Sequence, residues 1–303
     1  MKITMRKIIA LFICIFGFCT AFSISASADT GPKPSVKIQF KNMSSELCYA
    51  TLLSEYKSTG PQSVWDGDED HIYNYDLDID TWKKFVEYKD TDGYYFLQIG
   101  WQVNETKSLN WSYYPPQKFK ILLYFPDTDT FIVSGICERY AFDTYYTVDM
   151  EGINISSVDY DDSLSNNNRL NAYRSYRYSV EVISLIVRIV ITIAIEMAIA
   201  LLFGLRGKKV LLLLVMTNSA TQIILNVILN IINYNSGPLS FTILYILLEI
   251  FVFVLESIIY SMHMNKISEK THKISFYILY AFAANAISFV SGILVAHILP
   301  GIF

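Results

Sequence analysis

Residues 179–203 read SVEVISLIVRIVITIAIEMAIALLF, an apolar stretch of about 25 residues that only three ionisable side chains interrupt. A transmembrane helix needs about 20 mainly apolar residues. Three more stretches of this kind follow, at about 210–232, 241–262 and 274–299. We therefore expect residues 179–303 to form an α-helical bundle of four transmembrane helices in a lipid bilayer.

The residues before this region have a different composition. Between positions 29 and 178 there are 23 Asp/Glu and 14 Lys/Arg, a net charge of −9, whereas 179–303 has 5 acids and 7 bases, a net charge of +2. A domain this acidic does not suit the phosphates of nucleic acid, so no nucleic-acid partner is expected. The composition predicts a soluble domain followed by a membrane domain.

The first 28 residues have the three parts of a secretory signal peptide. Lys2, Arg6 and Lys7 are basic, residues 8–22 are apolar, and Ala26-Ser27-Ala28 has the small-x-small pattern of a cleavage site. We expect cleavage after Ala28. A retained first membrane helix is the alternative, although an apolar run of about 15 residues is short for a span.

The loops between the four apolar stretches predict their orientation. The basic residues of these loops are Arg206, Lys208 and Lys209 after the first stretch, and Lys266, Lys270 and Lys273 after the third. The loop at 233–239 is uncharged. Because basic loops stay in the cytoplasm, we expect a multi-pass protein of the cell membrane with its N-terminal domain and its C-terminus outside.

Residues 29–162 are predicted to form a mainly β, sandwich-like extracytoplasmic domain, which a polar linker at 163–178 joins to the helices. Short segments rich in aromatic and β-branched residues, separated by turn residues, are typical of a β-sandwich. The strand candidates are Val36–Phe40, Cys48–Leu53, Tyr94–Trp101, Phe119–Tyr124, Phe131–Val133 and Tyr140–Val148. One helix is expected at Asp80–Tyr88, with Asp80 as its N-cap.

Two cysteines, Cys48 and Cys137, remain in the chain after the expected cleavage. Exported domains fold in an oxidising compartment, so an even pair predicts a disulfide between them. The alternative is two buried free thiols. Both interpretations stay open from the sequence.

The predicted outer domain has no catalytic signature, since it contains neither a Gly-x-Ser-x-Gly elbow nor a His-Glu-x-x-His motif. Asp66, Asp68 and Asp70 have the spacing that begins a calcium loop, but Leu77 stands where such a loop needs its last Glu. A second acidic run at 76–80 also departs from the pattern. We expect a solvated acidic surface, no metal or other cofactor, and a protein that is not an enzyme.

Polar residues inside the predicted membrane helices are costly, so each needs a reason. They are Arg188, Glu196, Asn218, Gln222, Asn226, Glu249, Glu256 and Asn285. We expect them to turn inward, with Arg188 paired to one carboxylate and the amides satisfying the others. One interpretation is a binding site or proton path lined by Glu196, Glu249 and Glu256. The other is a set of interhelical hydrogen bonds that only fixes the bundle.

Several stretches together resemble uncharacterised exported four-span membrane proteins of low-GC Gram-positive bacteria. They are Pro32–Val36, Thr51–Ser54, Ser58–Pro61, Tyr113–Pro116, Tyr140–Phe142, Thr217-Asn218 and Thr221-Gln222. The resemblance covers most of the mature chain. It implies the architecture and a bacterial origin, and it implies no activity and no catalytic residue.

The sequence favours a non-enzymatic protein of the cell envelope, whose outer domain binds a ligand, polymer or partner protein and whose bundle anchors it. A small transporter or an ion- or proton-conducting bundle that uses Glu196, Glu249 and Glu256 is the first alternative. An intramembrane enzyme is the second. Because four spans are few for a transporter that acts alone, a homo-oligomer or a complex with another envelope protein is expected.

Overall fold

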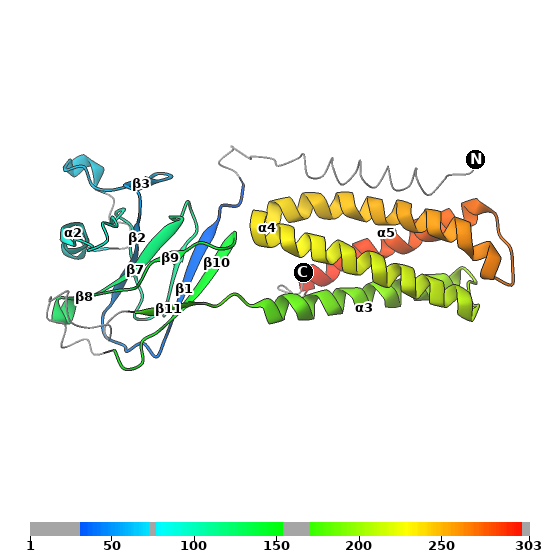
Figure 1. Ribbon diagram of the computed structural model, residues 1–303, viewed down its shortest axis with the longest axis horizontal. Helices are drawn as coiled ribbons and strands as arrows, with labels where there is room; N and C mark the ends of the chain where they lie inside the picture. Colours follow the sequence, from blue (N-terminus) through cyan, green and yellow to red (C-terminus); the bar gives the residue numbers. More distant parts are fainter. Residues whose placement is uncertain (1–30, 73–76, 154–169, 299–303) are drawn as a thin grey trace. The chain divides into compact units, whose positions relative to one another are not determined.

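The computed structural model describes residues 31–72, 77–153 and 170–298. The chain divides into two compact units, Lys33–Tyr178 and the helices from Ser179 onward, and each is described by itself (Figure 1). The expected signal peptide, 1–28, and residues 163–169 of the expected linker lie outside the described residues.

The N-terminal unit contains two sheets. The first has the strand order β11-β10-β1-β6, in which β1 pairs with β10 in parallel and with β6 in antiparallel register. Its strands are β1 (Ser35–Lys41), β6 (Ser108–Trp111), β10 (Asp143–Asp149) and β11 (Asn171–Arg174). The prediction of a β-sheet domain in this part of the chain is confirmed.

The second sheet has the order β5-β2-β7-β8, and β9 also pairs with β7. Its strands are β2 (Tyr49–Ser54), β5 (Trp101–Gln102), β7 (Lys118–Phe125), β8 (Thr130–Val133) and β9 (Cys137–Glu138). A small hairpin, β3 (Ser58–Thr59) with β4 (Gln62–Ser63), and two short 3₁₀ helices, η1 (Glu69–His71) and η2 (Pro126–Thr128), complete the connections.

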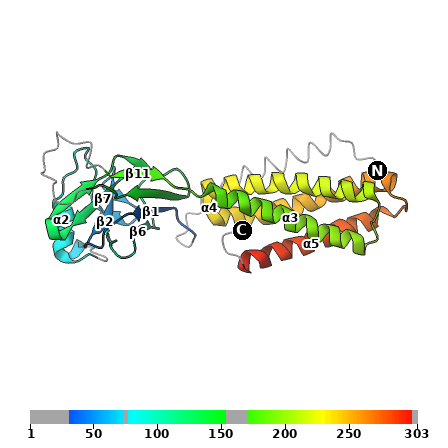
Figure 2. The same ribbon diagram turned by 90° about the horizontal axis from the view of Figure 1, so that it is seen from below.

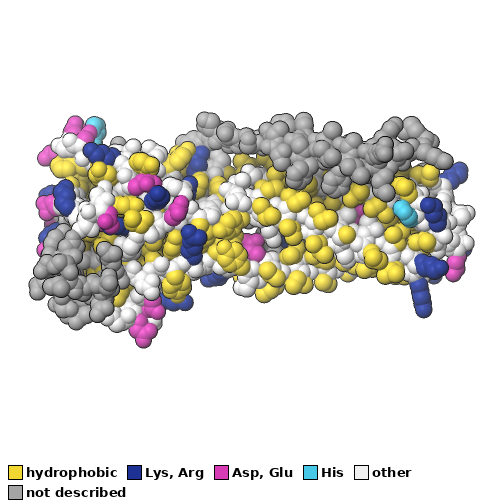
Figure 3. Space-filling view, in the orientation of Figure 1, with side chains coloured by type: hydrophobic (Ala, Val, Ile, Leu, Met, Phe, Trp, Pro, Cys, Tyr) yellow, Lys and Arg dark blue, Asp and Glu magenta, His cyan; other side chains and the backbone are white. Residues whose placement is uncertain are grey.

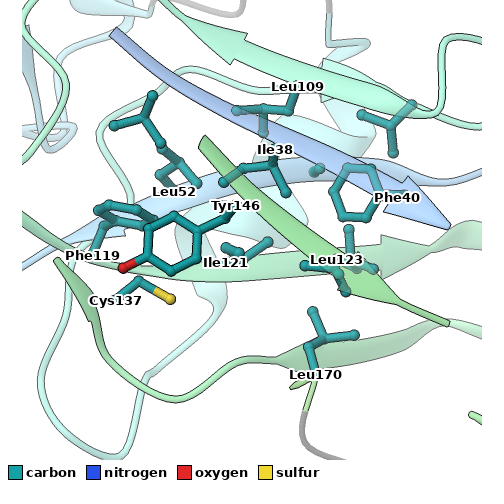
Figure 4. Packing of buried hydrophobic residues seen from close by; sticks show 14 of the residues in the cluster. Ile38, Phe40, Leu52, Leu109, Phe119, Ile121, Leu123, Cys137, Tyr146 and Leu170 are labelled. Atoms are coloured by element: carbon teal, nitrogen blue, oxygen red, sulfur yellow. The ribbon is translucent and has the colours of Figure 1, made fainter. Parts of the chain in front are cut away.

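The two sheets share one hydrophobic core, as in a sandwich. Ile38 of β1 and Tyr146 of β10 lie in the same buried cluster as Leu52 of β2 and Ile121 of β7 (Figure 4). Strand β2 is buried on both faces, because Leu52 belongs to this core and the next residue of the strand, Leu53, belongs to a second core. This double burial explains why β2 has a continuous apolar sequence rather than an alternating one.

Helix α2 (Ile79–Glu87) covers that second core with Trp82 and Phe85. The sequence placed its N-cap at Asp80, and this is wrong. Asp78 is the cap, because its Oδ1 accepts hydrogen bonds from the backbone N–H groups of Asp80 and Thr81. The helix therefore begins earlier in the acidic run, and a carboxylate still occupies the N-terminal end, where it satisfies free N–H groups.

The predicted strand Tyr94–Trp101 is not one strand. Its beginning forms a single bridge between Tyr95 and Ser54, and its end forms the two-residue β5. Between them Gln98 has a positive φ of 59°, which no extended strand allows. Strand β11, at Asn171–Arg174, lies in the segment that the sequence assigned to the linker.

Cys48 and Cys137 are both buried free thiols, so the disulfide alternative is wrong. Cys48 precedes Tyr49, which pairs with Tyr124 of β7, whereas Cys137 pairs with Phe119 at the other end of β7. This register separates the cysteines by roughly 20 Å along the strand. A disulfide needs Cα atoms within about 7 Å. Burial also raises the pKa of both thiols, that of Cys137 to about 11.

The C-terminal unit consists of three helices: α3 (Tyr178–Leu202), α4 (Lys208–Ile267) and α5 (Ile274–Ile298). Among the described residues, these three are long and apolar enough to cross a membrane. Helix α4 has 60 residues and is interrupted at Gly237, which has φ 79° and ψ −178° and precedes Pro238. It folds back there into a first arm (208–236) and a second arm (238–267), which lie side by side (Figures 1 and 2).

The helical unit has apolar side chains outside and polar side chains inside. Large hydrophobic residues such as Ile186, Met216 and Phe282 are more than half exposed, whereas Glu196 and Glu256 are about fully buried. The visible surface of the helices is accordingly hydrophobic along most of its length (Figure 3). A water-soluble bundle would have the opposite distribution.

Candidate functional site

The candidate site is the group of buried polar side chains between the helices. Small residues bring the backbones close together there, since Ala200 of α3 and Ala281 and Ala284 of α5 are buried in one cluster with Tyr260 and Tyr280. Close approach of this kind lets polar side chains on different helices reach each other. Asn218, Gln222 and Asn226, spaced by four on the first arm, are all buried on the inner face, as the sequence predicted.

Glu256 on the second arm connects three helical segments. Its Oε1 accepts a 2.8 Å hydrogen bond from the Thr221 hydroxyl on the first arm. Its Oε2 accepts a 2.8 Å hydrogen bond from the Asn285 amide on α5. Asn285 Nδ2 also donates to the backbone oxygen of Ala281, which fixes the amide. Both carboxylate oxygens of Glu256 are therefore satisfied by neutral donors.

Glu196 on α3, unlike Glu256, has no hydrogen-bond donor for its carboxyl group among the described residues. Its side chain is 1% exposed, and in the described part of the chain neither carboxylate oxygen has a hydrogen-bond partner. The amide Nδ2 of Asn218 is the donor that faces this carboxyl group, but it does not reach hydrogen-bond geometry with either oxygen. Glu256 and Glu249 are close enough to interact electrostatically with Glu196. A buried carboxyl group without partners is expensive in an apolar environment, so this position is under strong electrostatic strain.

Two tyrosines link this region to the neighbouring helices. The Tyr260 hydroxyl donates to Asn218 Oδ1 at 3.2 Å, and the Tyr280 hydroxyl donates to the backbone oxygen of Glu196 at 3.3 Å. Tyr280 thereby fixes α5 against α3 beside the Glu196 side chain. The cluster of Glu196, Asn218, Thr221, Glu256 and Asn285 is called the carboxyl cluster below.

Arg188 belongs to a second polar group. Its guanidinium donates to Asn226 Oδ1 at 3.2 Å and to the Ser184 hydroxyl at 3.3 Å, and it lies over the Phe241 ring. The Asn226 amide in turn donates to Gln222 at 2.8 Å. The expected pairing of Arg188 with Glu196, Glu249 or Glu256 is wrong, because none of the ion pairs in the described part of the chain joins Arg188 to these glutamates.

Glu249 lies outside the carboxyl cluster. It is only partly buried, and it stands seven residues before Glu256 on the second arm, which is about 10 Å along the helix. Tyr245 is its near neighbour, one helical turn earlier. The sequence grouped these three glutamates together. In the structure Glu196 and Glu256 are a buried pair, and Glu249 is peripheral.

The eight predicted residues therefore divide among the carboxyl cluster, the polar group of Arg188, and the separate Glu249. Three further residues donate hydrogen bonds to the carboxyl cluster. Thr221, Tyr260 and Tyr280 provide hydroxyl donors to Glu256, Asn218 and the Glu196 backbone. Thr221 and Tyr260 could be found from the sequence, because they lie on the same helical faces as Asn218 and Glu256. Tyr280 gives no such signal, since aromatic residues are frequent throughout this region.

Two neighbouring buried carboxyl groups can bind a proton or a cation. Both cannot ionise together in an apolar environment without a compensating positive charge. The carboxyl cluster contains no cysteine or histidine, and among the described residues no group of three His, Cys, Asp or Glu side chains could hold a metal ion. The arrangement is suited to binding and releasing a small positive species.

Several acidic residues of the N-terminal unit form hydrogen bonds or ion pairs with nearby groups of the same unit. Asp66 and Asp68 each accept a hydrogen bond from the backbone N–H two residues further on, and Asp66 also contacts His71 Nδ1 at 2.7 Å. Lys120, buried in the second sheet, forms ion pairs with Asp90 and Asp92 at 2.6–2.8 Å.

Comparisons with protein-family models, with curated proteins and with solved structures yield no match. The resemblance to exported four-span proteins of Gram-positive bacteria therefore stays a prediction. Function has to be argued from the geometry of this chain alone.

Proposed function

We propose that the chain is an integral membrane protein of the bacterial cell envelope, with four membrane crossings and an extracytoplasmic β-rich domain. The inverted polarity of the helical unit is the observation that carries this proposal, because only a lipid environment makes exposed Ile, Leu and Phe and buried Glu favourable together. The two arms of α4 supply the second and third crossings. Each arm, at about 30 residues, is long enough to cross the hydrocarbon.

Sidedness follows from the charges at the helix ends. One buried cluster contains residues beside both basic loops, namely Leu205 and Val210 at the first and Met264 and Tyr277 at the second. Both basic loops therefore lie at the same end of the helical unit. Placing that end in the cytoplasm satisfies the positive-inside rule. The break at Gly237 and the β-rich domain are then outside.

The outer domain is proposed to bind a ligand or partner, with the bundle as its membrane anchor. It is a compact unit with its own hydrophobic core, and it ends at Tyr178, where the first apolar helix begins. Large aromatic side chains such as Tyr56 and Tyr173 remain exposed on it. Exposed aromatic residues are enriched where proteins bind partners.

Cysteine labelling of the full chain in intact cells tests the topology. Ser236→Cys, beside the break in α4, and Tyr56→Cys, in the outer domain, should react with a membrane-impermeant maleimide. Lys209→Cys and Lys270→Cys, in the basic loops, should react only after permeabilisation. The unsubstituted chain is the control, and it should stay unlabelled because Cys48 and Cys137 are buried with raised pKa values.

Labelling of Ser236→Cys and Lys270→Cys from the same side would refute four crossings.

For the binding role, cross-linking of the tagged full chain in cells should enrich one partner or polymer. Tyr173→Ala should reduce that enrichment, and the surface variant Lys118→Ala on another strand should not. Equal enrichment of the partner by both variants would show that the face around Tyr173 does not bind it.

Glu196 favours a second function, proton or ion conduction by the bundle. A partnerless carboxyl group in a fully buried position is unfavourable for stability alone and is typical of proton and ion pathways. Proteoliposomes with an internal pH dye and an imposed potential would reveal the flux. The flux should be lost in Glu196→Gln and kept in Glu249→Gln. Equal flux in protein-free vesicles would exclude the function.

A further inference from the structure

The carboxyl cluster has a surplus of oxygen acceptors. Both carboxylate oxygens of Glu196 and the Oδ1 atom of Asn285 are buried without a hydrogen-bond partner among the described residues. Their side chains come from α3 and α5, and both residues are at least nine-tenths buried. One unpaired donor of the described chain, Asn218 Nδ2, faces Glu196, so three acceptors stand against one donor. Buried acceptors without donors are rare in folded proteins, and this surplus favours a ligand.

The acceptors belong to one site because hydrogen bonds join the residues around them. Asn285 is fixed through Nδ2 to Glu256, so its Oδ1 remains as a free acceptor next to that carboxylate. Tyr280, which precedes Asn285 on α5, binds the backbone of Glu196. Glu196 and Glu256 are also close enough to repel each other when both are charged.

We propose that Glu196, Glu256 and Asn285 form a binding site for one monovalent cation, which competes there with a proton. The inference rests on the conducting role proposed above and names its ligand. Oxygen atoms are the ligands that hard cations prefer, and every free acceptor of the site is an oxygen. A single positive charge relieves the repulsion between the carboxylates.

Divalent ions suit the site less well. Calcium takes six to eight oxygen ligands, commonly with several carboxylates, and magnesium needs a regular octahedron. The cluster has two carboxyl groups, and one of these is already committed to Thr221 and Asn285.

Other charged or titratable groups around the site do not replace the cation. Arg188, eight residues before Glu196 on α3, donates to Asn226 on the first arm and lies over Phe241. Glu249 and Tyr260 face the site from the second arm, and Tyr280 faces it from α5. Among these, only Glu249 adds a negative charge, and it lies outside the carboxyl cluster, about 10 Å from Glu256 along the second arm.

Thermal unfolding of the purified full chain in mild detergent tests the site. At pH 8, unfolding is followed in NaCl, KCl and choline chloride at equal ionic strength. Na⁺, K⁺ or both should raise the Tm in a saturable manner, by about 5 °C at saturation, relative to choline. At pH 5 the rise should shrink, because protons occupy the carboxyl groups.

Matched variants locate the effect. Glu196→Gln keeps the size of the side chain and should abolish the rise, whereas Glu249→Gln should keep it. A second measurement does not depend on any variant folding. Addition of NaCl to lightly buffered wild-type protein should release about one proton per chain, and choline chloride should release none.

An equal Tm in all three salts, or an undiminished rise in Glu196→Gln, would overturn the site. So would the absence of proton release. These outcomes are independent of cysteine labelling and of flux in vesicles, so failure of the site can be told apart from failure of the proposed topology or conduction.

Discussion

Thr221 Oγ1 and Glu256 Oε1 are joined by a 2.8 Å hydrogen bond, although the two residues are 35 positions apart in the helical segment α4. In a straight helix they would be about 52 Å apart. The bond therefore requires the two arms to run in opposite directions. Tyr260 and Asn218, 42 positions apart, repeat this relationship one turn away.

The reversal of α4 depends on Gly237. Its φ of 79° with ψ near 180° is a conformation that essentially only glycine adopts. Gly237→Ala should lower the free energy of unfolding by about 1–3 kcal/mol. Ser236→Ala at the neighbouring exposed position is the control and should be nearly neutral. Thermal unfolding in detergent measures both, and equal stability of the two variants would show that the turn tolerates a side chain.

The bond between Thr221 and Glu256 should be measurable as a coupling energy. A double-mutant cycle of Thr221→Val and Glu256→Gln should give about 0.6 kcal/mol, the average for hydrogen bonds between membrane helices, and at most about 1.7 kcal/mol. Thr242→Val is the comparison, because its hydroxyl donates only to its own helix at Pro238. A coupling energy of zero would mean that the two arms are held by packing alone.

Lys120 should be essential to the outer domain. Its ammonium group is buried and bonds both oxygens of Asp90, which also accepts backbone N–H groups of the following turn. Lys120→Met removes one partner and leaves a buried carboxylate, so the loss should be about 3–5 kcal/mol. Lys118→Met at an exposed position should cost little. Denaturant unfolding compares them, and similar values would contradict the buried ion pair.

His71 should titrate above the ordinary histidine value. Its contact with Asp66 raises the pKa of the imidazole above 6.5, chiefly through the hydrogen bond. The stabilisation from the pair is present below that value and is lost as the pH rises through the raised pKa. NMR titration should show the pKa falling in Asp66→Asn and staying nearly constant in Asp70→Asn. An unchanged value in Asp66→Asn would exclude the contact.

The sequence predicted those features that depend on local pattern. The apolar stretches predicted the long helices, and the uncharged loop predicted at 233–239 contains the break in α4, which is confined to Gly237. Alternation predicted β1, and aromatic and β-branched content predicted β7. The short polar strand β11 was not predicted, because its pairing with β10 rather than its own composition makes it a strand.

The candidate site was harder to predict because it depends on how helices rotate against each other. Periodicity placed Glu249 and Glu256 on one face of a helix, yet only Glu256 reaches Thr221 and Asn285. Counting charges suggested that Arg188 would neutralise a glutamate, but it binds Asn226 instead. Such differences come from the packing of residues that are distant in sequence.

Glu256 has two neutral hydrogen-bond donors, whereas Glu196 has no hydrogen-bond partner among the described residues, and the stabilities of their Gln variants should differ accordingly. Thermal unfolding of Glu196→Gln and Glu256→Gln should be measured in choline chloride at pH 8, where the proposed site is empty. Glu256→Gln should be less stable than wild type by about 1 kcal/mol, because Gln cannot accept from both Thr221 and Asn285. Glu196→Gln should be as stable as wild type or more stable, since it removes a buried carboxyl group whose oxygens have no hydrogen-bond partner among the described residues. A loss of stability in Glu196→Gln equal to that in Glu256→Gln would contradict the account.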